Sequence, residues 1–233
     1  MNPIKLIVAL AAISMLGVTT SAVAENASIA DHMHEHHAAM IKIQNAIIAG
    51  SLVSAREPAT WLAEHAEPAG LPPAGDVFVA AVRESANAVL SADSLETAAE
   101  ATSRMGLACG NCHVASSVEV VFDETKNPSE EIKDKPHMQR HQWAADRMWE
   151  GLIGPSDRAW SRGGNLLFES PIKPDALAAH GGGDETITMS RRIHQLAGNA
   201  TVVSDPEERA EIFAEFIANC GACHTELHQG PKP

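Results

Sequence analysis

Cys220-Gly221-Ala222-Cys223-His224 lies near the end of the chain, and the same pattern stands at Cys109-Gly110-Asn111-Cys112-His113. The two copies use all four cysteines of the sequence. A Cys-x-x-Cys-His run is typical of covalent c-type haem attachment, in which both thiols form thioethers and the adjacent histidine supplies an axial nitrogen to iron. We therefore expect two covalently bound haem c groups, one in each half. Their anchoring residues are Cys109, Cys112, His113, Cys220, Cys223 and His224.

Other interpretations of paired cysteines fit this sequence less well. A structural zinc site takes its ligands from short spacings, whereas these two pairs lie more than a hundred residues apart. A thioredoxin-like motif sits near a βαβ pattern, and no strand pattern surrounds either pair. A disulfide across a two-residue gap on a helix would be strained, and it would give no role to the histidine that follows.

Steps of three and four between apolar or histidine positions predict four helices in the first half. The first covers residues 28–49, the second covers 51–65, and the third begins after an Asp76 N-cap. Asp93 or Ser94 is the expected N-cap of the fourth, which runs through the haem motif to Val121. Four helices with short or moderate loops are typical of a four-helix bundle.

The second half repeats the first. Trp61–Glu64 matches Leu166–Glu169 at an offset of 105 residues, and the same offset maps His32-Met33 onto His137-Met138. After a longer loop in the second half the offset becomes 111, and the two haem motifs coincide. Asp205 is the expected N-cap of the final helix. The sequence therefore predicts an all-α fold of two tandem antiparallel four-helix bundles, each with its haem motif on the C-terminal helix.

The first residues have the features of a secretory signal peptide. Lys5 precedes an apolar stretch at Leu6–Val18, and Ala22-Val23-Ala24 fits a small-x-small cleavage site. The apolar stretch is too short for a membrane span, and no later segment reaches that length. We expect cleavage near Ala24 and export to a periplasm, with an uncleaved N-terminal anchor as the alternative. The expected organisation is a signal peptide at 1–24, bundles at 25–125 and 137–233, and a charged linker at 126–136.

The formal net charge of −13 makes the protein strongly acidic. Nucleic-acid binding requires a basic face, so this composition argues against it. Aromatic residues make up only 4% of the chain, which argues against stacking platforms for bases. The partner that the charge favours is another redox protein with a basic docking face.

A four-helix bundle with its haem motif on the last helix resembles the cytochrome c′ family, the class II c-type cytochromes. The resemblance implies that His113 and His224 are the proximal iron ligands and that the first helix of each bundle supplies the residue on the other side of the iron. That residue is apolar in five-coordinate members and a methionine in low-spin members. Class II bundles often dimerise through their first two helices, which implies such packing between the two halves, or a dimer. The chain departs from the family in carrying two bundles and a histidine-rich first helix.

Candidates for the second axial ligand come in pairs that the repeat relates. They are Met33 or His36 in the first half and Met138 or His141 in the second. The two candidates of a pair are three residues apart and share a helix face, so only one can reach the iron. Spacing leaves this choice open, and a five-coordinate iron is the third option. His32 and His137 are further candidates for the axial ligand, and we place them at the helix start. An alternative role for the stretch Asp31–His37 is a divalent metal site.

The sequence favours electron transfer over catalysis. No hydrolytic or nucleophilic constellation is visible, and the haem motifs consume every cysteine. With both faces of each iron ligated, no substrate position remains, so we expect a one-electron carrier that is not an enzyme. A five-coordinate protein that binds or senses nitric oxide or carbon monoxide is the alternative. A di-haem peroxidase-type enzyme is the third hypothesis, because it needs only one open haem and a distal group.

Overall fold

The computed structural model describes residues 17–65, 71–72, 75–122 and 136–227. Helices make up most of this described part and it contains no β-strand, so the predicted all-α class is confirmed. Most of the predicted signal peptide and nearly all of the predicted linker lie outside the described residues.

Four helices form the first half: α1 (Gly17–Ile48), α2 (Leu52–Glu64), α3 (Gly75–Ser91) and α4 (Leu95–Ala115). Side-chain caps explain two of the starts. The Ser51 hydroxyl accepts from the Ser54 amide before α2, and Ser94 forms a capping box with Thr97 before α4.

The second half contains α6 (His137–Ile153), α7 (Asp157–Glu169), α8 (Pro174–Ala178), α9 (Asp184–Ala200) and α10 (Pro206–Glu226). The Asp205 carboxylate accepts from the Glu208 amide, 3.0 Å away, so the predicted cap of the last helix is confirmed. The short α8 lies in the segment that the sequence predicted to be a loop.

Three helix limits differ from the sequence prediction. Helix α1 begins at Gly17, so His32 lies well inside the helix and is buried, rather than standing at its start. Helix α3 begins at Gly75, which puts Asp76 in its first turn instead of at the N-cap. Helix α4 ends at Ala115, because Ser117 adopts a φ of 53° that an α-helix cannot continue through.

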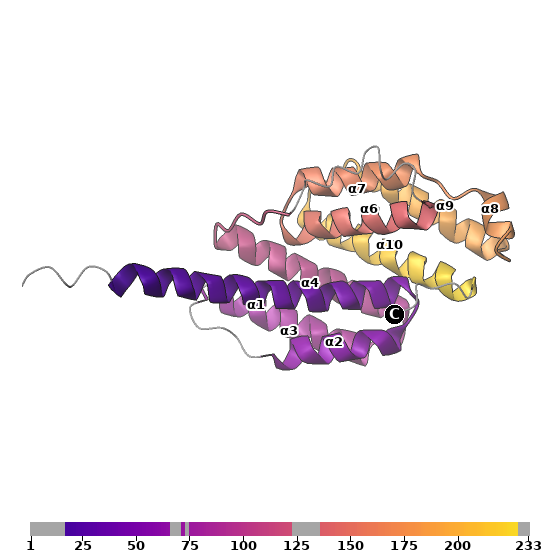
Figure 1. Cartoon of the computed structure of the whole chain (residues 1–233). Coiled ribbons are helices and arrows are strands. Elements are labelled where there is room, and N and C mark those ends of the chain that lie inside the picture. The colour runs from indigo at the N-terminus through magenta and orange to yellow at the C-terminus, as the bar shows by residue number, and fades with distance from the viewer. Residues whose placement is uncertain (1–16, 66–70, 73–74, 123–135, 228–233) are drawn as a thin grey trace, which may run out of the picture.

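The two motif-bearing helices form the centre of the molecule. Each half packs helices that are neighbours in sequence, α1 on α2, α2 on α3 and α3 on α4 in the first, and α6 on α7, α7 on α9 and α9 on α10 in the second. Between the halves, α4 packs on α10, while α1 also meets α10 and α6 meets α4 (Figure 1). The expectation that the halves meet through their first two helices is therefore wrong, because each motif helix reaches across to the opposite half.

Large aromatic side chains fill the core beside this central contact. Trp149, Trp160, Phe213 and Phe216 are almost fully buried, all in the second half. Within the described residues, no helix is both long and apolar enough to cross a membrane.

Candidate functional site

The four cysteines lie in the last turns of α4 and α10 and are free thiols. Cys220 and Cys223 are buried, while Cys109 and Cys112 are half-buried. Burial, with a smaller contribution from Cys112, raises the pKa of Cys109 to about 12, and burial raises that of Cys220 in the same direction. These two thiols are therefore neutral at pH 7, whereas a thiolate is the form that ligates a metal directly.

The motif histidines make the same long-range contact in both halves. Nδ1 of His113 lies 2.7 Å from the carbonyl oxygen of Ile153, and Nδ1 of His224 lies 2.6 Å from that of Ile48. A carbonyl oxygen can only accept, so each Nδ1 carries the proton and each Nε2 keeps its lone pair. Both acceptors are the last residue of the first helix in the opposite half.

The glycine of each motif permits this crossing. A Cβ atom on Gly110 would lie 2.4 Å from the carbonyl oxygen of Leu152, and one on Gly221 would lie 2.2 Å from that of Ile47. Neither distance is possible for a real Cβ atom and a backbone oxygen. Glycine at the second motif position thus lets the opposite first helix approach and present its terminal carbonyl to the motif histidine.

In the first half, α1 presents two different surfaces near the motif. The Met40 sulfur lies 3.9 Å from the Cys109 sulfur, so one surface faces the thiols of α4. Met33 is half-buried two turns earlier and belongs to the same stripe as Met40. His36 instead lies against α2, with its ring centroid 5.5 Å from that of Trp61 and 5.5 Å from that of His65. His36 therefore has ring neighbours on α2, and Met33 shares the α1 stripe of Met40.

In the second half, the histidine candidate is buried and the methionine is not. His141 is 7% exposed, and its Nε2 lies 2.9 Å from the carbonyl oxygen of Ser170, whereas Met138 is 44% exposed. Burial lowers the pKa of His141 to about 4, against the opposing effect of its hydrogen bond to the Ser170 carbonyl. The imidazole is therefore neutral at pH 7, with its proton on Nε2 and its lone pair on Nδ1.

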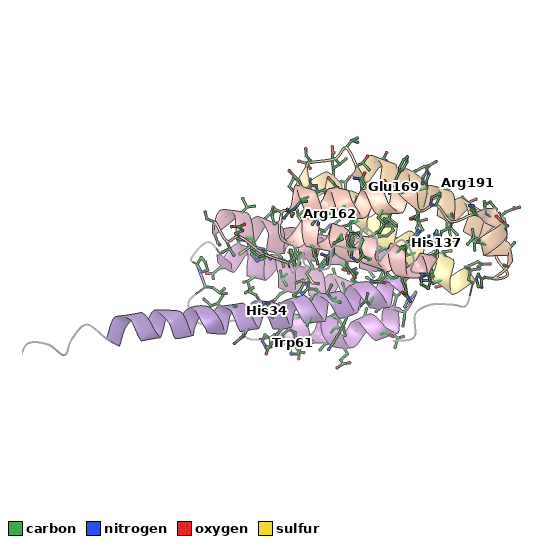
Figure 2. All side chains as sticks on the ribbon, turned by 45° about the horizontal axis from the view of Figure 1, so that its top comes forward. His34, Trp61, His137, Arg162, Glu169 and Arg191 are labelled. Atoms are coloured by element: carbon green, nitrogen blue, oxygen red, sulfur yellow. The ribbon has the colours of Figure 1, made fainter. Side chains whose placement is uncertain are left out.

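The histidines in the histidine-rich stretch of α1 have different surroundings in the structure. His32 and His36 come together with His65, a residue that the sequence analysis did not connect with them. His34 is exposed on α1 (Figure 2), and the ring centroid of His37 lies 6.3 Å from that of Phe122. The sequence did contain a signal for His65: α1 and α2 are joined by a tight turn at Gly50, and residues equally far before and after such a turn lie opposite each other.

An acidic groove of about 790 Å³ lies between α4 and α10. The second Cys-x-x-Cys-His motif contributes Ala222 to its wall, and one arginine, Arg104, lines it as well. The acidic residues that line it are Glu96, Glu100, Glu207, Glu211 and Glu215.

The chain matches no protein-family model, no curated protein and no solved structure. The chemistry of the site therefore has to be inferred from its own residues and their geometry.

Proposed function

We propose that this protein is an exported di-haem c-type cytochrome that carries single electrons between redox partners. In this proposal it consists of two tandem four-helix bundles similar to cytochrome c′, each binding one haem c on its last helix. The observation that carries the proposal is the hydrogen bond from Nδ1 of each motif histidine to a backbone carbonyl. Histidines that bind a metal through one nitrogen commonly donate the other N–H in this way.

The residues at both motifs fit a covalently held haem. Cys109 and Cys112 in one half, and Cys220 and Cys223 in the other, provide two thiols one helical turn apart, immediately before the histidine. The carbonyls of Ile153 and Ile48 orient the two imidazoles and select the tautomer with a free Nε2. When bound, each haem iron supplies a one-electron couple whose potential depends on its axial ligands.

The second axial ligand differs between the halves in this proposal. We assign Met33 in the first half, because His36 lies among the imidazoles beside α2 and Met33 shares a stripe with Met40, which contacts Cys109. We assign His141 in the second half, because it is buried and its Nδ1 keeps a lone pair, whereas Met138 is 44% exposed. Methionine raises the potential of a haem relative to histidine, so the first haem should have the higher potential.

The electron-transfer partner is a redox protein with a basic face. The chain carries a formal net charge of −13, and the acidic groove between α4 and α10 reaches Ala222 inside the second motif. Opposite charge accelerates such an encounter, and salt screens it. Electron exchange with a basic redox protein should therefore slow as ionic strength rises.

The haem content of protein produced with a cytochrome c maturation system tests the proposal. We expect two haems per chain that survive denaturation, one haem in the Cys109→Ala/Cys112→Ala variant and one in the Cys220→Ala/Cys223→Ala variant. Haem that is absent, or that is lost on denaturation, would contradict covalent attachment. The mass of the exported protein gives its N-terminus and so tests cleavage near Ala24.

Absorption spectra test the axial assignment and the choice of electron transfer over gas binding. Both haems should show low-spin spectra with sharp α and β bands, unchanged by carbon monoxide. Met33→Ala should convert one haem to high spin, His141→Ala should convert the other, and His36→Ala should leave both unchanged. A high-spin spectrum in the unmodified protein that shifts with carbon monoxide would favour gas binding.

A further inference from the structure

Three imidazoles from two helices of the first half meet at one place. His32 and His36 lie one turn apart on α1, and His65 is the C-cap residue of α2. One ring nitrogen from each lies within 4.8 Å of the other two. The ring centroids of His32 and His36 are 4.2 Å apart, and those of His32 and His65 are 5.0 Å apart.

Neighbouring residues hold His65 in this position. Its ring stacks on Trp61, with a centroid distance of 3.9 Å and an interplanar angle of 24°. Its backbone carbonyl accepts a 2.8 Å hydrogen bond from the Arg83 guanidinium on α3. Glu35 places a carboxylate oxygen 3.8 Å from Nε2 of His65. Carboxylates beside imidazoles are typical outer partners of metal-binding histidines.

The Nε2 atom of His36 is buried and has no hydrogen-bond partner among the described residues. A buried polar nitrogen without a partner costs free energy, so its retention calls for a ligand. The nearest polar groups that can share a ligand with it are the other two imidazoles of the cluster.

The second half provides an internal comparison. His137 and His141 repeat the α1 pair, with ring centroids 4.5 Å apart and an interplanar angle of 45°. The position equivalent to His65 is Ser170, whose carbonyl oxygen binds Nε2 of His141. The two histidines of the first helix therefore face a third imidazole in the first half and a backbone carbonyl oxygen in the second half.

We propose that His32, His36 and His65 bind one divalent late first-row metal ion, with zinc as the reference ion. Three histidine nitrogens and a fourth position open to water form a known zinc coordination. Around a zinc ion with bonds of about 2.0 Å, the nitrogens stand about 3.3 Å apart. Side-chain rotations that bring the rings closer by roughly 1–1.5 Å complete the site. It binds the metal independently of the haems, since His36 and His65 lie against Trp61 of α2, whereas Met40 meets Cys109 of α4.

Zinc titration of the tag-free holoprotein tests the proposal, with competition against a chromophoric zinc indicator as the readout. We expect one tight equivalent per chain and unchanged haem spectra. His65→Ser gives the first half the residue that stands at the equivalent position of the second half. It should weaken zinc binding by at least about 100-fold, because loss of an outer partner of a metal ligand alone costs at most about that much. His34→Ala, at an exposed position on the same helix, should leave the affinity unchanged.

A second ligand variant gives an independent check. His32→Ala should weaken zinc binding as His65→Ser does, because it removes another of the three proposed ligands. Equal zinc affinity in the unmodified protein and in His65→Ser would overturn the proposal, and so would the absence of any tight equivalent. A change of haem spectrum in His36→Ala would also overturn it, because His36 would then belong to the iron. Failure of the zinc titration would leave the two-haem result unaffected.

Discussion

The two halves of the molecule agree around the motif histidines and differ around the histidines of their first helices. His113 and His224 donate to equivalent carbonyls, and the motif glycines pack against equivalent backbone oxygens, at the offsets of 105 and 111 that the sequence repeat shows. The first helices diverge, since His65 faces the α1 histidines where Ser170 faces those of α6. The shared contacts run between the halves, and the differing ones lie within each half.

This difference shows which contacts constrain the two copies of the repeat. A contact that crosses between the halves involves both copies of the motif, so a change at either position disturbs the partner half. A contact inside one half can vary without affecting the other half. The third imidazole, which is present in the first half only, takes part in such a contact. One core position departs from this pattern: Gln44 occupies in the first half the position of Trp149 in the second, although the Trp149 ring lies against Gly106 of the opposite half.

Replacing Trp149 with alanine should have the largest effect on stability. Trp149 is fully buried, its ring lies against Gly106, and its centroid is 5.5 Å from that of Phe213. Removing a buried tryptophan typically costs about 3–5 kcal/mol. Urea denaturation should show this loss, and a loss below about 1 kcal/mol would mean that the central contact between the halves is not closely packed.

Zinc should stabilise the first half and leave the second unaffected. At a free zinc concentration 100-fold above the dissociation constant, binding to the folded state alone adds about 2.7 kcal/mol to the free energy of unfolding. Thermal denaturation with and without zinc should show the effect in the unmodified protein and lose it in His65→Ser. A shift of equal size in both proteins would place the zinc elsewhere.

The two motif glycines should respond alike. Gly110→Ala and Gly221→Ala each force a methyl group against a carbonyl of the opposite half, and overpacking of this kind costs about 1–3 kcal/mol. Gly198→Ala is the matched control, because that helical glycine has only an ordinary 3.4 Å contact with Phe168, and alanine should stabilise it by about 0.5–1 kcal/mol. Urea denaturation measures the free energy of unfolding of all three variants. Unequal losses at the two motif glycines would show that the two crossing contacts are not equivalent.

The smallest expected effect concerns Gln44. Its side chain is fully buried, and neither amide atom has a hydrogen-bond partner among the described residues. Gln44→Met keeps an unbranched side chain and removes the unpaired amide, so the free energy of unfolding should rise by about 1 kcal/mol. Destabilisation in the same urea experiment would show that the amide has a partner in solution.

Local signals predicted the helices well. The helix predicted at 51–65 matches α2, and the polar residues Ser94 and Asp205 cap the helices that they were expected to cap. The same reasoning extended α4 to Val121, because apolar residues continue the period beyond the point where the backbone at Ser117 leaves the helix. Periodicity reports which face is apolar, and it does not report where the hydrogen-bonded backbone ends.

Long-range contacts were beyond the sequence. The repeat identified His113 and His224 as equivalent, but spacing cannot show that their acceptors, Ile153 and Ile48, come from opposite halves. The expectation of contact through the first two helices failed for the same reason. His65 could have been connected with His36 from the turn at Gly50, and it was missed because the second half has no histidine at the equivalent position.

The hydrogen bonds that cross between the halves also determine the order in which the surroundings of the two motif histidines can form during synthesis. The carbonyl that accepts from His224 belongs to a residue 176 positions earlier in the chain, whereas His113 depends on a residue 40 positions later. A chain that emerges from its N-terminus therefore completes the surroundings of His224 as soon as α10 exists, while His113 must wait for the end of α6. The motif that emerges first is the one that cannot be completed when it emerges.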